Sequence, residues 1–268
     1  MEEKLEHLKK ILMEMESVLI AYSGGVDSTF LLKVARDILE DKVIAVTALS
    51  PIYPEEEAEE AKKIARNLGV KHLLLETREL EDPDFTSNPP ERCYYCKKEL
   101  FSRLKNLATE NKIKWVADGS NQDDTNDFRP GMQAARELGI RSPLKEAKLT
   151  KDEIREWSRK MGLPTWRKPS FACLASRFPY GVSINKRDLE RINQAERFLK
   201  NLGIHQVRVR HHQNIARIEV EVDDLPKLLD KHHRYEIVKK IKELGYTYVT
   251  VDLEGYRSGS MNEILNKK

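Results

Sequence analysis

A six-residue turn between two apolar segments constrains this chain more than any other feature of its sequence. The turn reads Ser23-Gly24-Gly25-Val26-Asp27-Ser28. It follows the apolar run 18–22 and precedes 29–36, which has the apolar spacing of a helix. A strand, a glycine turn and a helix N-terminus bind phosphate well, because backbone N–H groups point at the anion. We therefore predict that these six residues bind phosphate, with Asp27 positioning either Mg²⁺ or a phosphate-binding water.

The turn is not a Walker-type phosphate loop, because no Gly-Lys-Ser/Thr follows its glycines. It resembles instead the pyrophosphate loop (PP-loop) of the ATP pyrophosphatases. That resemblance implies an enzyme that cleaves ATP between its α- and β-phosphates and adenylates an oxygen of the substrate. ATP and Mg²⁺ are then the expected cofactors.

Apolar strands and amphipathic helices alternate through the first half of the chain. This order predicts a doubly wound α/β fold, with a parallel sheet covered on both faces. The expected strands are 18–22, 42–48, 72–76 and 114–119, and the expected helices are 1–15, 29–36, 55–68 and 94–110.

Ligands of such sheets bind at the carboxyl ends of the strands. The turn at 23–28, the strand end at 48–50 and the polar segment 119–124 should therefore surround one crevice. A glycine followed by short polar and acidic residues suits ribose, phosphate or magnesium. The candidate ligands for ATP are Ala48, Gly119, Asn121 and Asp124, and the candidate for magnesium beside Asp27 is Asp123.

A second, smaller domain of α+β type is expected after an irregular segment at 162–181. We predict a PP-loop domain over 1–181 and a substrate or oligomerisation domain over 182–268. The runs 207–210 and 216–222 alternate as antiparallel strands with one solvated face. The other expected elements are helices at 187–202, 225–231 and 235–244 and a strand at 248–253.

Composition and charge exclude several classes of protein. The chain has 268 residues, of which 40% are hydrophobic and 34% charged, as in globular proteins. No apolar run is long enough for a membrane helix, and the acidic, amphipathic N-terminus does not resemble a secretory signal. The net charge of +3 is too small to indicate a nucleic-acid partner. We therefore expect a cytoplasmic protein with no membrane association.

Three cysteines in a reducing compartment favour metal binding or catalysis over disulfides. Cys93 and Cys96 have the spacing that lets two sulfurs face one metal, at a predicted helix start with basic neighbours. A redox dithiol, a zinc site, an iron–sulfur site and two inert core thiols remain alternatives. Cys173 lies among Arg167, Lys168 and Arg177, whose positive charge favours a nucleophilic thiolate. A cluster bound by all three cysteines would leave one iron open to hydrosulfide, unless another ligand took that position.

Four segments together resemble the LarE family. They are 23–28, 118–124, the run from Arg129-Pro130-Gly131 to Leu144, and 172–181 around Cys173. The resemblance implies an ATP-dependent sulfur transferase of nickel-pincer nucleotide biosynthesis. Such an enzyme adenylates a carboxylate of pyridinium-3,5-biscarboxylic acid mononucleotide, releases pyrophosphate and forms a thiocarboxylate. It also implies a homo-oligomer, a hexamer in the family.

The chain departs from the single-cysteine members of that family, in which the cysteine matching Cys173 gives up its own sulfur. Cys93 and Cys96 place it in the three-cysteine branch, which is expected to hold a [4Fe-4S] cluster and to turn over with an external sulfide donor. Arg208 and Arg210 share one face of a strand. With Arg177 they are candidates for the substrate phosphate. For Arg208 and Arg210 a merely solvated basic face is the alternative.

Two other functions remain open. A PP-loop tRNA thiolase can also hold a cluster with three cysteines, although no zinc-finger segment or basic excess supports it here. A non-catalytic nucleotide-binding module would release no pyrophosphate with any substrate.

Overall fold

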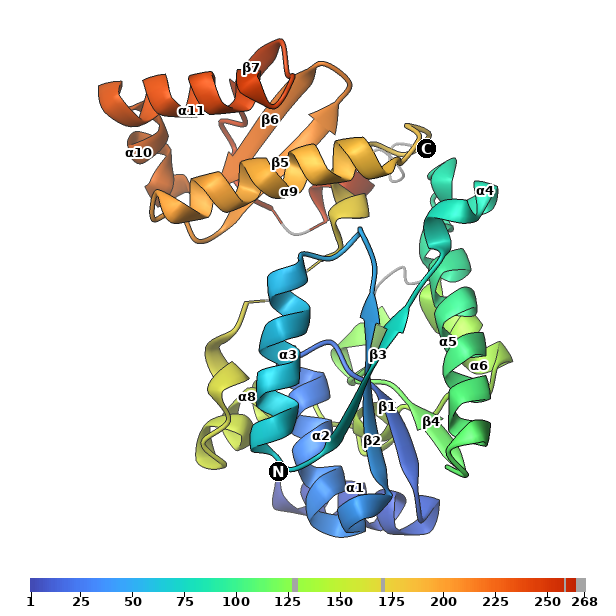
Figure 1. Ribbon diagram of the computed structural model, residues 1–268. Coiled ribbons are helices and arrows are strands. Elements are labelled where there is room, and N and C mark those ends of the chain that lie inside the picture. The colour runs from blue at the N-terminus through green and yellow to red at the C-terminus, as the bar shows by residue number, and fades with distance from the viewer. Residues whose placement is uncertain (127–129, 170–171, 258, 264–268) are drawn as a thin grey trace. The chain divides into compact units, whose positions relative to one another are not determined.

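The computed structural model describes residues 1–126, 130–169, 172–257 and 259–263, which form two compact units. Unit 1 contains Met1–Glu79 and Glu91–Phe171, and unit 2 contains Leu80–Pro90 and Ala172–Lys268. Each unit has its own sheet and hydrophobic core, and each is described by itself (Figure 1). Residues 80–90 belong to unit 2, whereas the predicted boundary at residue 181 assigns them to the first domain. The functions predicted for the two domains stay predictions.

The sheet of unit 1 is entirely parallel in the described residues. Its order is β3-β2-β1-β4, with Val18 of β1 in register with Val43 of β2 and Trp115 of β4. The strands are β1 (Val18–Ala21), β2 (Val43–Leu49), β3 (Lys71–Glu76) and β4 (Trp115–Ala117).

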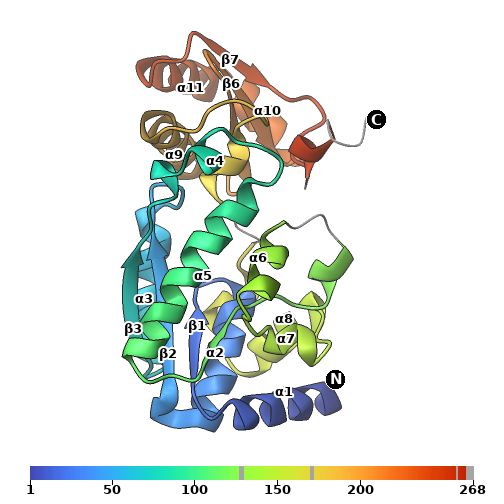
Figure 2. The ribbon, with the colours of Figure 1, turned by 90° about the vertical axis from the view of Figure 1, so that its right-hand side faces the viewer.

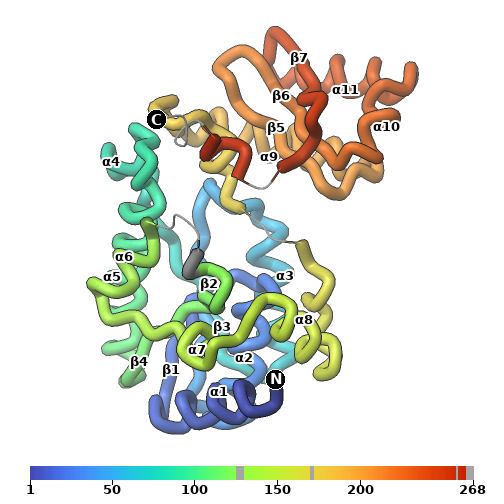
Figure 3. Tube along the Cα trace, turned by 180° about the vertical axis from the view of Figure 1, so that it is seen from behind, coloured from blue at the N-terminus to red at the C-terminus, as the bar shows by residue number. Residues whose placement is uncertain are grey.

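Helices cover both faces of this sheet, as the alternating pattern predicts. Val18 and Ile20 face a core shared with α1, α2 and α3, whereas Leu19 faces a core shared with α5 and α6. Figure 3 shows α1, α2, α7 and α8 on the first side, and Figure 2 shows α5 and α6 together on the second. The bounds are α1 (Glu2–Met15), α2 (Val26–Leu39), α3 (Glu55–Asn67), α5 (Arg92–Glu110), α6 (Gly131–Glu137), α7 (Pro143–Glu146) and α8 (Lys151–Lys160). The doubly wound fold is thereby confirmed.

The strand order places a topological switch point beside β1. From β1 the chain winds through β2 to β3 on one side, and β4 then pairs with the other edge of β1. Ligand crevices of open α/β sheets form where the order reverses, outside the carboxyl ends of the strands. The loops that follow β1 and β4 are therefore the ones that should form the binding site.

Unit 2 combines a three-stranded sheet with helices on one face in the described residues. β5 (Val207–His212) pairs antiparallel with β6 (Ile215–Val220), as predicted, and β6 pairs parallel with β7 (Tyr248–Val251). Alternate residues Val207, Val209 and Ile218 pack against α9 and α11. The helices are α4 (Pro83–Thr86), α9 (Lys186–Asn201), α10 (Leu225–Leu229) and α11 (Lys231–Glu243).

Hydrogen bonds from Asn88 hold the segment 80–90 in unit 2. Its fully buried side chain donates from Nδ2 to the carbonyl oxygens of Pro179 at 2.7 Å and Val182 at 3.1 Å. The N–H of Ile184 donates to the carbonyl oxygen of Thr86 at 2.8 Å. These bonds explain why a segment from the first half of the sequence belongs to the later unit. None of the helices within the described ranges is long and apolar enough to cross a lipid bilayer.

Candidate functional site

The nucleotide loop, Ser23–Ser28, is braced by its own serines. Ser23 Oγ lies 3.1 Å from Ser28 Oγ and accepts a hydrogen bond from the N–H of Gly25 at 3.3 Å. Gly25 is the N-cap of α2, and among the described residues no side chain caps this helix. The N–H groups of the first turn are therefore available to an incoming phosphate.

Helix α3 packs directly against the nucleotide loop. A Cβ atom at Gly24 would lie 2.9 Å from Cβ of Ala61 and 3.2 Å from its Cα. Gly24 also has a φ of 68°, in the left-handed region that favours glycine. Both the backbone conformation and the close approach of α3 therefore require glycine at this position.

The loop after β4 meets the nucleotide loop at Asp27 and Ser28. A Cβ atom at Gly119 would lie 3.1 Å from the backbone nitrogen of Ser28. Asn121 is buried, and its Nδ2 donates to Oδ1 of Asp27 at 3.2 Å. The N–H of Asn121 donates to Oδ2 of Asp124 at 2.9 Å. The structure thus brings the predicted residues of both loops together at the switch point.

Lys151 is a site residue that the sequence analysis missed. Its Nζ forms an ion pair with Oδ2 of Asp27, and its backbone N–H donates to Oδ2 of Asp123 at 2.7 Å. Lys151 begins α8, which Thr150 caps through a capping box with Glu153. The Thr-x-x-Glu spacing at 150–153 is a sequence signal for that helix start. No local pattern, however, links Lys151 to Asp27, because 124 positions separate them.

The carboxyl end of β2 lies at the same edge of the sheet as the nucleotide loop, because β1 and β2 are parallel. Ala48 is partly exposed there, and Ser50 donates a hydrogen bond from Oγ to Oε1 of Glu79. Ser50 Oγ also accepts from the N–H of Ile52 at 3.2 Å. Glu79 is only 2% exposed, and this burial raises the pKa of its carboxyl. The Ser50–Glu79 bond links the backbone that follows β2 to the segment that follows β3.

Cys93 and Cys96 lie in the first turns of α5, where the sequence places them. Both are outside disulfides; Cys93 is exposed and Cys96 partly exposed. Residues three apart on a helix are neighbours on its surface. α6 approaches this turn closely, since a Cβ atom at Gly131 would lie 3.2 Å from the carbonyl oxygen of Cys93. Arg129, just before it in the family-like segment, lies outside the described residues.

Cys173 belongs to unit 2 and is partly exposed at the start of the 3₁₀ helix η5 (Leu174–Arg177). Arg177 holds this turn in place: its Nη1 donates to the carbonyl oxygens of Ala172 at 2.8 Å and Cys173 at 3.1 Å. Its Nε and Nη2 donate to the two carboxylate oxygens of Glu196, at 2.8 and 2.9 Å. Arg177 therefore organises the backbone of the cysteine turn.

Two expectations about charge need correction. Arg177 is fully buried and bound to Glu196, so in this structure it presents no exposed guanidinium to a substrate phosphate. Lys168 pairs with Glu57 and Glu60. The positive charge expected around Cys173 is thus largely compensated by carboxylates that the local sequence does not reveal.

The prediction that the strands of unit 2 have one solvated face is wrong for β5. Arg208 and Arg210 share a face, but each is only 5% exposed. The guanidinium of Arg208 lies 5.2 Å from the centre of the Tyr256 ring. Arg210 donates from Nη2 to Glu219 at 2.6 Å and to Ser260 at 3.1 Å. The segment after β7 covers this face, which strand periodicity alone cannot predict.

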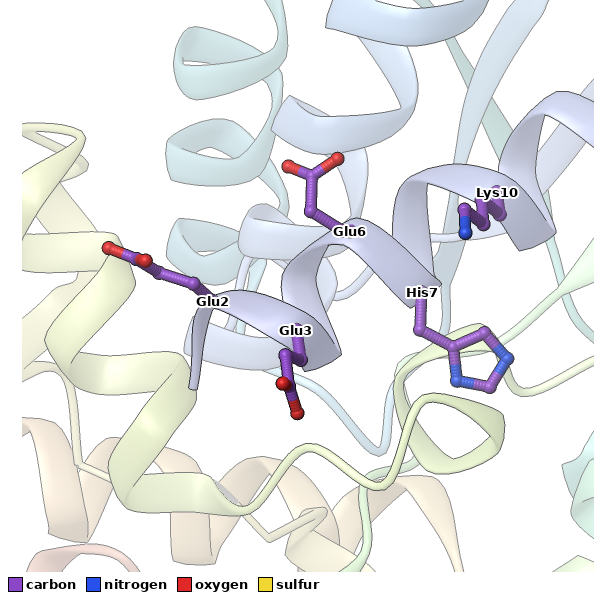
Figure 4. A pocket seen from close by; sticks show the side chains of 5 residues that line it. All are labelled: Glu2, Glu3, Glu6, His7 and Lys10. Carbon is purple, nitrogen blue, oxygen red and sulfur yellow. The ribbon is translucent and has the colours of Figure 1, made fainter.

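No three His, Cys, Asp or Glu side chains gather for a metal ion within the part of the chain that the structure describes. Because Cys173 lies in the other unit from Cys93 and Cys96, the predicted cluster stays a prediction. Figure 4 shows a surface hollow on α1, lined by exposed side chains that no other observation connects to the site. They are Glu2, Glu3, Glu6, His7 and Lys10.

Comparisons with known proteins agree with this arrangement. The family model described as NAD synthase matches residues 2–91, which include the nucleotide loop and α3. An uncharacterized protein of Synechocystis, slr1717, is 46% identical over the full length of both chains. A protein of Methanocaldococcus jannaschii, MJ0830, is 34% identical over 95% of this chain and 96% of its own length.

A relative with a named activity covers almost the whole chain. It is the pyridinium-3,5-bisthiocarboxylic acid mononucleotide synthase of Lactiplantibacillus plantarum, 39% identical over 96% of this chain and 92% of its own length. A match of this extent includes both units, the nucleotide loop and the Cys173 turn. This chain therefore belongs to the LarE family of PP-loop enzymes.

Proposed function

We propose that this enzyme adenylates a carboxylate of a pyridinium mononucleotide with ATP and converts it into a thiocarboxylate. The observation that carries the proposal is the near-complete match to the Lactiplantibacillus plantarum synthase. The geometry of unit 1 supports the first step, because both loops of a PP-loop site meet at the switch point of its sheet.

In the first step, a carboxylate oxygen of the substrate forms a bond to the α-phosphorus while the bond to the β-phosphate oxygen breaks. The products are an acyl adenylate and pyrophosphate. In this proposal, Ser23, Ser28 and the N–H groups that begin α2 bind the leaving pyrophosphate, which the uncapped start of that helix supports. Lys151, which pairs with Asp27 of the same loop, would supply a cation. Donors fixed before the reaction stabilise the charge that develops on the leaving group.

Asp27 and Asp123 fit a magnesium site. Magnesium in nucleotide sites is held by one or two carboxylates together with phosphate oxygens. Both carboxylates contact Lys151: Asp27 accepts from its Nζ and Asp123 from its backbone N–H. A bound Mg²⁺ would neutralise phosphate charge there. Ala48, Gly119, Asn121 and Asp124 complete the proposed nucleotide site.

In the second step, a hydrosulfide sulfur bonds to the acyl carbon and AMP leaves, with no change of oxidation state. We propose that Cys93, Cys96 and Cys173 bind a [4Fe-4S] cluster. The donor set fits, since two thiols three positions apart on one helical turn are typical cluster ligands. When bound, the cluster would supply an open iron position for hydrosulfide from an external donor.

The arginines of unit 2 are proposed to position groups around this chemistry. Arg177 holds the carbonyl oxygens at Ala172 and Cys173, and Arg210 donates from Nη1 to the carbonyl oxygen of Ser176 at 3.2 Å. Contact of Arg208 and Arg210 with the substrate phosphate stays a prediction. A homo-oligomer also stays a prediction, which sedimentation of the purified protein would test.

The experiment is anaerobic purification followed by iron and sulfide quantification and by assay with ATP, Mg²⁺, sulfide and the pyridinium mononucleotide. The proposal expects about four irons per chain, pyrophosphate release and a thiocarboxylate product seen by mass spectrometry. The Cys93→Ala/Cys96→Ala double variant should lose iron and multiple turnover. Many turnovers by that variant would show that Cys173 acts alone. Absence of pyrophosphate release by the wild-type protein would refute the adenylation step.

A further inference from the structure

Lys168 is held by two carboxylates of helix α3, in unit 1. Its Nζ lies 2.8 Å from Oε2 of Glu57 and 2.7 Å from Oε2 of Glu60, and its side chain is 14% exposed. Burial opposes the charge of Lys168, but hydrogen bonds and charges from the two carboxylates outweigh burial and raise its pKa. We call these three residues the Lys168 clamp.

The backbone at Lys168 is also held, from helix α8. Arg155 donates from Nη1 to the carbonyl oxygen of Trp166 at 2.6 Å and from Nη2 to that of Lys168 at 2.9 Å. Lys168 is thus fixed through its side chain by α3 and through its carbonyl group by α8. Figures 1 and 3 show α8 and the segment that follows it beside α3.

The helix that holds Lys168 also contacts the nucleotide loop. Ala61 follows Glu60 directly and makes the close approach to Gly24. α3 is a regular helix over Glu55–Asn67, so Glu57, Glu60 and Ala61 lie within about one turn. One rigid element therefore joins Lys168 to the loop where ATP is proposed to bind.

Lys168 lies close to Cys173 along the chain, five positions before it. A chain of five residues spans at most about 18 Å when fully extended. A fixed Lys168 therefore limits the region that the Cys173 thiol can reach. The lysine is the most buried member of the clamp, since Glu57 and Glu60 are 25% and 49% exposed.

We propose that the Lys168 clamp is a positioning device for sulfur transfer, which fixes the chain leading to Cys173 to the helix that packs on the nucleotide loop. This inference rests on the proposed function, in which Cys173 takes part in the second step. Lys168 touches neither ATP nor substrate in this account. Its removal should therefore impair thiolation and spare adenylation.

The test compares two reactions in the same holoenzyme carrying Lys168→Met. Pyrophosphate exchange into ATP, in the presence of the pyridinium mononucleotide, reports adenylation alone. Thiocarboxylate formation with added sulfide reports both steps. We expect exchange within twofold of wild type and a kcat for thiocarboxylate at least tenfold lower, with the KM for ATP unchanged. Lys168→Arg, which keeps the bridge to both carboxylates, should restore most of the kcat.

The matched control is Lys62→Met on the same helix. Lys62 forms an exposed pair with Glu59 at 3.8 Å, with side chains 45% and 72% exposed. This variant removes one lysine charge that pairs with a glutamate of α3, as Lys168→Met does, and should change neither reaction. The Glu57→Gln/Glu60→Gln double variant breaks the clamp from its other side and should reproduce the loss seen with Lys168→Met.

Other outcomes overturn the inference. Equal losses of exchange and thiolation in Lys168→Met would show a general structural role, and full thiolation would show no role. Failure of Lys168→Arg to restore the kcat would contradict positioning through the two carboxylates. A wild-type enzyme without exchange would instead overturn the proposed function, and the role of the clamp with it. The two failures are therefore distinguishable.

Discussion

Gly24 shows how one residue can be required for two separate reasons. Its φ of 68° costs a residue with a side chain about 1–2 kcal/mol. A Cβ atom would also lie 2.9 Å from Cβ of Ala61, a distance at which the loop or α3 must move. The second reason concerns function, because the nucleotide loop is one of the two segments that would have to move.

Gly24→Ala should therefore reduce pyrophosphate exchange by about 100-fold, equivalent to about 2.7 kcal/mol in the barrier. Gly139→Ala is the control, since Gly139 has a φ of 67° and nothing within 4 Å of its Cβ position. It should cost about 1 kcal/mol of unfolding free energy and leave exchange intact. Exchange rates and thermal melts of both variants test the comparison; equal losses of exchange would contradict it.

Residues also mark where prediction from sequence stops. The nucleotide loop could be predicted because its strand, turn and helix are continuous in the chain. Arg208 and Arg210 could be assigned to one face by their spacing, but their burial depends on Tyr256 and Ser260. The buried partner of Arg177, Glu196, likewise comes from another element. Local patterns specify the direction of a side chain and not what later covers it.

The buried Arg177–Glu196 pair should make unit 2 sensitive to acid. Burial opposes ionisation of Glu196, but Arg177 outweighs burial and holds the pKa of that carboxyl below its usual range. The stabilisation is then present above the unfolded pKa of about 4.3 and is lost as pH falls through the lower, folded pKa. Glu196→Gln should lack this pH-dependent share of the stability.

At neutral pH, Glu196→Gln should destabilise unit 2 by about 3–5 kcal/mol, because it leaves Arg177 buried without a counter-charge. Asp224→Asn is the control: Asp224 pairs with Lys227, whose side chain is 52% exposed. Exposed pairs contribute about 0–1 kcal/mol. Chemical denaturation from pH 3 to pH 8 measures both. Similar losses in the two variants would contradict the importance of burial.

At the scale of elements, the N-terminal cap of helix α8 fixes the position of Lys151, the first residue of that helix, which pairs with Asp27 of the nucleotide loop. Thr150 accepts from the N–H of Glu153, and the Glu153 carboxylate accepts from the N–H of Thr150. The capping box is readable in the sequence, yet the helix was not among those predicted. Its contact with Asp27 could not be read at all, because it depends on the tertiary fold.

Thr150→Ala should cost about 1 kcal/mol of stability. It should also weaken ATP binding about fivefold, if a similar free energy is lost from the position of Lys151. Asp230→Ala is the matched control, because Asp230 caps α11 of unit 2 through the N–H groups of His232 and His233. It should lower stability without changing ATP affinity. Calorimetric titration with ATP and Mg²⁺ would show the difference, and equal affinities would refute it.

At the scale of the whole molecule, two units with separate cores should melt as two transitions. In our proposal ATP with Mg²⁺ binds unit 1, so it should raise the melting temperature of only one transition. The free energy of unfolding of that unit should increase by RT ln(1 + [L]/Kd), where [L] is the concentration of free ATP. Asn88→Ala should lower the melting temperature of the other transition, because buried carbonyl groups of unit 2 lose their hydrogen-bond donor. Asn88→Gly keeps the φ of 56° and should show the same loss. Scanning calorimetry decides; an Asn88 variant that lowers the ATP-sensitive transition would contradict this assignment.

The place of Asn88 has a consequence for how the protein is made. Translation delivers residues 80–90 long before the partners of Asn88 around Pro179 and Val182 leave the ribosome. Unit 2 therefore cannot complete its fold until the nascent chain has passed that point, and contacts so distant in sequence are slow to form. A gene fragment that begins at residue 172 would encode a unit missing one of its own parts.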